Sequence, residues 1–213
     1  MALEATHLRF ALDVRDDYHV VDFSRYLSGT IYPDSRYVTG VEWSLTHPRD
    51  FDRIPFPKED DFRKGWETHL IYDLVQGAVF ARMTGTEHVT QGDEEWRQRI
   101  AFKIIQNEID FGFLDTIEVF SKLNVVLTPF NESIGPIRRY FDCVVDFLRE
   151  GTGGVTRIED IPIFKASGLS EKHRELLDDV CGRCECFRND PIMMEKISGI
   201  YDETMRMYRE QHR

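Results

Sequence analysis

The feature that most constrains the fold is an apolar stretch carrying two ionisable side chains four residues apart. Within residues 61–80, apolar side chains recur at the three- and four-residue spacing of a helix that faces a core. His69 and Asp73 share one face of that helix, and we expect both to point into the interior. An imidazole and a carboxylate are costly in an apolar interior without a compensating partner. A bound metal ion would compensate them, and a His–Asp hydrogen bond within the core is the alternative.

Composition limits the partners of this chain. Its 213 residues are enough to bury a sizeable core, and its formal net charge of −11 argues against nucleic acid and against stable membrane association. No segment approaches the roughly 18 apolar residues of a membrane span. The first ten residues lack the layout of a signal peptide, so we expect a cytoplasmic protein. The sequence leaves homo-oligomer formation open.

The hydrophobic pattern predicts helices almost throughout. They are expected over about 3–14, 22–31, 61–84, 94–123, 136–151, 170–180 and 190–208, with Gly85, Asp93 and Ser170 among the end signals. Residues 34–61 and 151–167 are expected to be irregular. We predict an all-α fold: a single helical bundle in which 1–165 form the metal-binding domain and 166–213 a C-terminal helical extension packed on it.

Three further polar side chains lie in suggestive places. His7 adjoins the apolar stripe of the first helix, Asp34 follows Pro33 at a helix end, and His47 precedes Pro48 in a loop. Each alone has an ordinary account, as a core histidine, a turn residue or a loop histidine.

Together these residues form a specific order: His7, then Gly29 to Pro33-Asp34, then Thr46-His47, then Gly65-Trp66 followed by His69 and Asp73. This order resembles the zinc-dependent phospholipase C family and its bacterial relatives, over roughly residues 3–80. The resemblance implies an all-α, phospholipase C/nuclease-like fold with two metal ions.

By this resemblance, Asp34, His47, His69 and Asp73 hold one ion, and His7 with a bridging Asp73 holds the second. Asp34 and Asp73 are thereby also the expected catalytic residues. Zinc is the expected metal, and iron or manganese would use the same ligands. Secreted members bind a third zinc further along the chain, where this sequence offers only His88.

The implied function is that of a metal-dependent hydrolase, a zinc phosphoesterase acting on a small soluble phosphoester. Two alternatives remain: a phosphohydrolase like the HD-domain enzymes, although the chain has no His-Asp dipeptide, and a non-catalytic, metal-stabilised helical protein. Candidates for outer-shell or substrate contacts are Gln76, Glu108 and Arg36, with Lys103 a further basic candidate.

The cysteine run at 181–186 has two interpretations. Cys181, Cys184 and Cys186 could bind a soft metal together with Cys143. Free thiols near the end of a helix are the favoured interpretation, because no second Cys-xx-Cys pair occurs in the chain.

Overall fold

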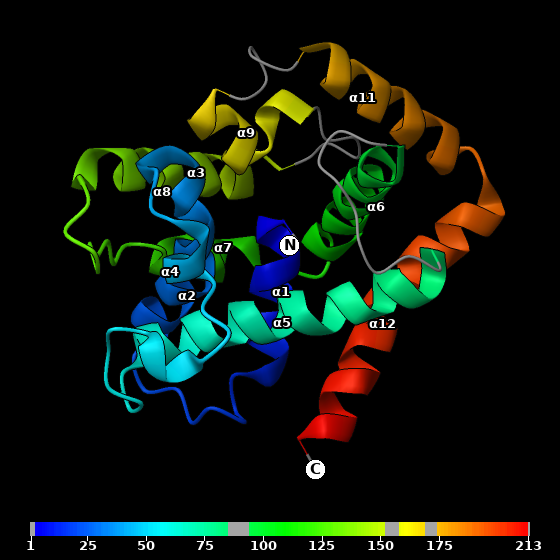
Figure 1. The fold of residues 1–213 in the computed structure, drawn as a ribbon. Helices are drawn as coiled ribbons and strands as arrows, with labels where there is room; N and C mark the ends of the chain where they lie inside the picture. The colour runs from blue at the N-terminus through cyan, green and yellow to red at the C-terminus, as the bar shows by residue number, and fades with distance from the viewer. Residues whose placement is uncertain (1–2, 85–93, 152–157, 169–173, 213) are drawn as a thin grey trace.

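The computed structural model describes residues 3–84, 94–151, 158–168 and 174–212. Every regular element within these ranges is helical, which confirms the predicted all-α class (Figure 1). The helices of more than one turn are α1 (Glu4–Val14), α2 (Phe23–Ile31), α5 (Asp61–Thr84), α6 (Glu94–Phe111), α7 (Thr116–Lys122), α8 (Ile134–Glu150), α9 (Pro162–Ser167), α11 (Arg174–Arg188) and α12 (Pro191–Gln211). Single turns occur at η1 (Tyr32–Ser35), α3 (Arg36–Thr39), α4 (Trp43–Thr46), η2 (Phe51–Arg53) and η3 (Ile158–Asp160).

Helix α5 lies across the middle of the molecule and contacts α1, α2 and α12 (Figure 1). Its closest neighbour is α2, and two glycines make that approach possible. A Cβ atom on Gly65 would lie 1.9 Å from the carbonyl oxygen of Tyr26, and one on Gly29 would lie 2.0 Å from that of Phe62. Backbone therefore packs directly on backbone where the two helices cross, and no side chain fits between them.

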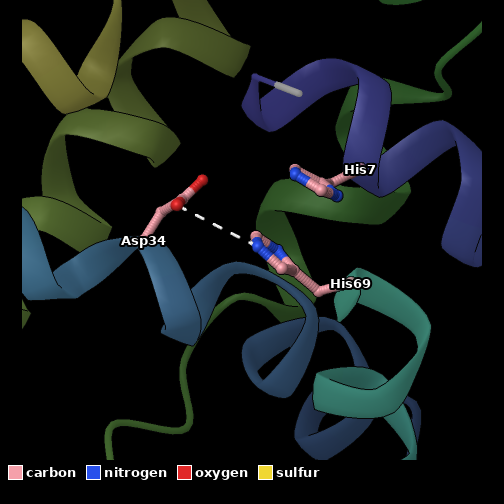
Figure 2. A group of neighbouring side chains, drawn as sticks. All are labelled: His7, Asp34 and His69. Carbon is pink, nitrogen blue, oxygen red and sulfur yellow. Dashed lines mark ion pairs between the residues drawn. The ribbon is translucent and has the colours of Figure 1, made fainter. Parts of the chain in front are cut away.

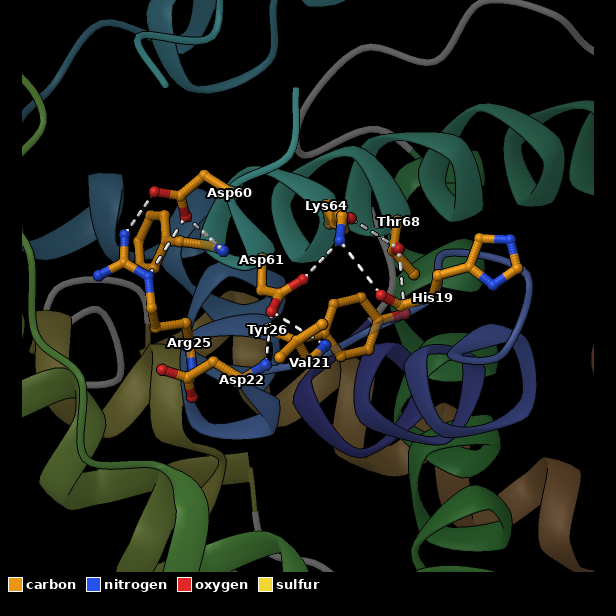
Figure 3. Close-up of polar contacts among 10 residues, drawn as sticks. His19, Val21, Asp22, Arg25, Tyr26, Asp60, Asp61, Lys64 and Thr68 are labelled. Atoms are coloured by element: carbon orange, nitrogen blue, oxygen red, sulfur yellow. Dashed lines mark hydrogen bonds and ion pairs between the residues drawn. The ribbon is translucent and has the colours of Figure 1, made fainter. Parts of the chain in front are cut away.

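The N-terminal end of α5 is tied to the segment that leads into α2 (Figure 3). The carboxylate of Asp61 accepts hydrogen bonds from the backbone N–H groups of Val21 and Asp22, at 3.0 and 2.5 Å. Lys64 donates to the same carboxylate at 2.7 Å. Because Asp22 in turn caps α2 through the N–H of Arg25, these contacts fix the register of α2 on α5.

Helix α6 also packs against α1. Arg9 donates to the fully buried Asp110 at 2.6 Å, and its guanidinium lies 3.6 Å from the ring centroid of Tyr201 on α12. Helix α11 packs on α6, and α12 contacts both α5 and α6. The domain boundary near residue 165 stays a prediction.

Some predicted element boundaries are wrong. The helix expected over 94–123 is two helices, because the chain turns at Gly112 and Asp115 caps α7 by accepting from the N–H of Glu118. The expected connector contains η3 and α9, the latter starting at Pro162. The expected end signals Gly85, Asp93 and Ser170 lie outside the described residues.

The cysteine run lies within α11 and not beyond its end. Helix α11 continues to Arg188, whose guanidinium is bound to Glu108 of α6 at 2.6 Å. Cys184 is buried against Ala101 of α6. None of the four cysteines forms a disulfide. Among the described residues, the groups of donors that could hold a metal ion contain no cysteine.

Helices that combine the length and the apolar character needed to cross a bilayer are absent from the described part of the chain.

The glycines at the contact between α2 and α5 allow a mutational test with an internal control. We expect Gly65→Ala to lower the free energy of unfolding by at least roughly 3 kcal/mol, because the new methyl group would displace backbone atoms of α2. Gly77 lies on an open face of the same helix with no heavy atom within 4 Å of a built Cβ. Gly77→Ala should therefore stabilise the protein by about 0.5–1 kcal/mol. Urea denaturation measures the free energy of unfolding of both variants. Equal changes in the two would contradict the direct packing of backbone at Gly65.

Candidate metal centre

The structure brings together all five side chains that were predicted as metal ligands. His7 comes from α1, Asp34 from η1, His47 from the end of α4, and His69 and Asp73 from α5. Figure 2 shows His7, Asp34 and His69 turned toward one another. Donor atoms of His7, Asp34 and His69 lie within 4.8 Å of one another, and so do those of His47, His69 and Asp73.

Asp73 is the centre of this cluster. Its Oδ1 lies 3.5 Å from Nε2 of His7, while its Oδ2 lies 3.6 Å from Nε2 of both His47 and His69. The two oxygens of one carboxylate thus face different histidines, which is the arrangement that a carboxylate bridging two ions requires. Asp34 approaches the same nitrogen of His69, with its Oδ1 4.0 Å from Nε2.

Four of the cluster's donor atoms have no hydrogen-bond partner among the described residues. Nε2 of His7, His47 and His69 and Oδ1 of Asp34 are all buried and make no hydrogen bond there. Buried polar atoms in native proteins are almost always satisfied, so a group of them facing one space indicates a missing partner. Neutral imidazoles with carboxylates are the donors that zinc, iron and manganese prefer. The residues present therefore fit a metal ion.

Two threonines orient the imidazoles. Nδ1 of His69 lies 2.8 Å from the carbonyl oxygen of Thr30, which can only accept, so this nitrogen donates and Nε2 keeps its lone pair. Nδ1 of His47 lies 2.9 Å from the hydroxyl of Thr46. The backbone of Thr46 is itself held by Trp66 of α5, whose Nε1 donates to its carbonyl oxygen at 2.7 Å. Such contacts are typical of the residues that orient metal-binding histidines.

Burial keeps the three imidazoles neutral. It lowers the pKa of His7 and of His47 to about 3 and that of His69 well below its usual value. Burial and the nearby Asp73 raise the pKa of Asp34. Burial also acts to raise the pKa of Asp73, but favourable charge interactions with its surroundings outweigh burial and lower it. At neutral pH the cluster is thus a set of neutral imidazoles around one carboxylate, which suits a cation.

The predicted outer residues have different surroundings. Gln76 is buried one turn beyond Asp73 and donates to the hydroxyl of Tyr72 at 3.3 Å. Arg36 follows Asp34 by two residues and stacks on Tyr37. Glu108, predicted to orient a ligand, instead forms the ion pair with Arg188 that holds α11 on α6. The third-ion candidate His88 lies outside the described residues.

Glu4 is a buried carboxyl near this centre that sequence reasoning missed. It is 1% exposed, Tyr140 donates to its Oε1 at 3.3 Å, and its Oε2 has no partner among the described residues. Burial is the main cause that raises the pKa of Glu4 to about 7. Its position in the first turn of a helix made it resemble an ordinary exposed acidic residue, and no sequence signal distinguished it.

Comparison with known proteins yields no relative: no family model, no curated protein and no solved structure matches this chain. The resemblance to zinc-dependent phospholipases C stays a prediction, and the function is inferred from the geometry of the centre.

The raised pKa of Glu4 gives a pH-dependent test on the metal-free protein. In the unfolded chain Glu4 has its usual pKa of 4.5, whereas in the folded protein its pKa is about 7, so the folded state keeps the proton to higher pH. The stability that this group contributes is therefore fully present below pH 4.5 and is lost as the pH rises through 7. Relative to wild type, Glu4→Gln should gain roughly 3 kcal/mol of unfolding free energy between about pH 4 and pH 8. Urea titration in the presence of a chelator measures this gain. The exposed Glu195→Gln is the control, and a pH-independent difference for Glu4→Gln would contradict the assignment.

Proposed function

We propose that this protein is a metal-dependent hydrolase of phosphoesters. The observation that carries the proposal is the position of Asp73, whose two carboxylate oxygens face three buried imidazoles with unpartnered nitrogens. A site that only needed internal hydrogen bonds would place these atoms in contact with one another. Here they stand 3.5–3.6 Å apart around a common space.

The donor set divides naturally into two groups. His47, His69 and Oδ2 of Asp73 would hold one ion, and His7, Asp34 and Oδ1 of Asp73 would hold the other. This division moves Asp34 from the first ion, as predicted from the sequence, to the second, because Asp34 lies within reach of His7. Two neighbouring divalent ions, zinc by preference, supply Lewis-acid polarisation of a phosphoryl group and a more acidic water.

The protein supplies orientation and access. Thr30 and Thr46 hold the imidazoles of His69 and His47 with their Nε2 atoms toward Asp73. Asp73 is 14% exposed, whereas the side chains of His7 and His69 are 1% exposed or less. The substrate therefore approaches from the side of Asp73. Around the ligands, the low local dielectric strengthens every interaction with an anionic phosphoryl group.

Burial of the cluster favours one alternative, a non-catalytic protein in which the metal only stabilises the fold. Four of the five ligands are at most 7% exposed. A structural ion is usually enclosed on all sides, and a catalytic ion keeps an open position. The number of bound ions and the presence of turnover distinguish the two functions.

The test is elemental analysis and hydrolysis of 4-nitrophenyl phosphate by the wild type and Asp73→Ala. We expect about two metal equivalents and chelator-sensitive turnover for the wild type. Asp73→Ala should lose metal and more than about 100-fold in turnover, with a lower melting temperature. Asp16→Ala, which removes a carboxylate whose side chain is 99% exposed, is the control and should behave as the wild type. Full metal occupancy and turnover in Asp73→Ala would refute the bridging role, and one tightly held ion without turnover in the wild type would indicate the non-catalytic alternative.

A further inference from the structure

A half-exposed tryptophan lies next to the candidate metal centre. The ring of Trp43 on α4 stacks on the imidazole of His47, with the ring centroids 5.5 Å apart and the ring planes inclined by 8°. Nε2 of the same imidazole lies 3.6 Å from Oδ2 of Asp73. One imidazole ring therefore separates Trp43 from the carboxylate at the middle of the cluster.

The backbone turn that carries Trp43 fixes its position. The backbone N–H of His47 donates to the carbonyl oxygen of Trp43 at 2.7 Å, which closes one helical turn and sets the two side chains on the same face. Trp66 of α5 anchors the end of this turn by donating to the carbonyl oxygen of Thr46 at 2.7 Å. The indole is thus held in place before any ligand binds, which reduces the entropy lost on binding.

The cluster reaches solvent at the pair formed by His47 and Asp73. Their side chains are 6% and 14% exposed, and those of the other three predicted ligands are at most 2% exposed. Apolar side chains adjoin this pair: Trp43 is 49% exposed, Leu45 in the same turn is 38% exposed, and Leu74, which follows Asp73 in α5, is 72% exposed. Single exposed apolar side chains are common on proteins. Trp43 differs from these because it stacks directly on one of the two ligands at which the cluster opens.

We infer that the substrate is an aryl phosphoester, and that Trp43 binds its aromatic ring by stacking. A phosphoryl group held by the cluster has to direct its ester substituent toward solvent, past His47 and Asp73, because the remaining ligands are buried. Aromatic rings stack favourably on one another beyond the gain from buried area, and tryptophan offers the largest face for this contact. This inference rests on the proposed function and names the organic group of its substrate.

The test compares two non-hydrolysable ligands, phenylphosphonate and methylphosphonate, on the metal-loaded protein at a pH at which both are dianions. In calorimetry the wild type should bind phenylphosphonate about 10-fold more tightly than methylphosphonate. Trp43→Ala should lose most of this preference at unchanged affinity for methylphosphonate and unchanged metal content. Trp43→Phe, which keeps an aromatic face, should retain part of the preference. Ile192→Ala, which truncates a side chain that is 67% exposed on α12, is the control and should behave as the wild type.

The ratio of the two affinities separates a contact with the ligand from a structural role of Trp43. An equal loss of affinity for both phosphonates in Trp43→Ala, or a loss of metal, would overturn the inference, because Trp43 would then act only by supporting His47. Equal affinity of the wild type for the two ligands, or binding of neither, would overturn it as well. Absence of phenyl phosphate hydrolysis by the wild type, with phenylphosphonate binding still dependent on Trp43, would reject the proposed hydrolase function and leave the aromatic site standing.

Discussion

The structure of the centre depends on the direct backbone contact between α2 and α5. Gly29 and Gly65 allow the helices to approach until a carbonyl oxygen of each lies where a side chain would otherwise be. That contact places the carbonyl of Thr30 against Nδ1 of His69, and it places Asp34, four residues further along the chain, beside the same imidazole. One crossing thus fixes both the orientation of a ligand and the position of the next.

The candidate metal centre is costly for the folded protein. Nε2 of three imidazoles and Oδ1 of Asp34 are removed from water without a hydrogen bond among the described residues, and each such atom costs about 1–3 kcal/mol. The surrounding packing has to hold them there, and the contacts just outside the centre suit that role. Trp66 fixes the turn that carries His47, and Arg9 with Asp110 ties α1, which carries His7, to α6. Under the proposed function, metal binding would offset this cost, and binding and folding would then be coupled.

The sequence predicts those parts of the centre that are encoded locally or by residue order. The four-residue spacing of His69 and Asp73 places them on one face of their helix, and this does not depend on how the other helices pack. The convergence of His7, Asp34 and His47 followed only from the resemblance, because their separation in the chain says nothing about their distance in space. Glu4 was missed for the same reason: its burial depends on Tyr140, which is 136 residues away in the chain. The break of the helix expected over 94–123 was missed because the pattern of apolar residues continues through Gly112, where the chain turns before Asp115 caps the next helix.

His69 belongs to both groups of donor atoms, and this limits how two ions could bind side by side. Nε2 of His69 lies within reach of both donor groups, yet its single lone pair can bind only one ion, and Nδ1 is already bonded to the carbonyl oxygen of Thr30. An ion that takes His69 together with His47 leaves the second with His7, Asp34 and the remaining oxygen of Asp73. That second ion would have few protein ligands, and its open positions would be available to water and substrate. The bond between Thr30 and His69, formed where α2 crosses α5, would therefore leave His69 a single nitrogen to offer to the two proposed ions.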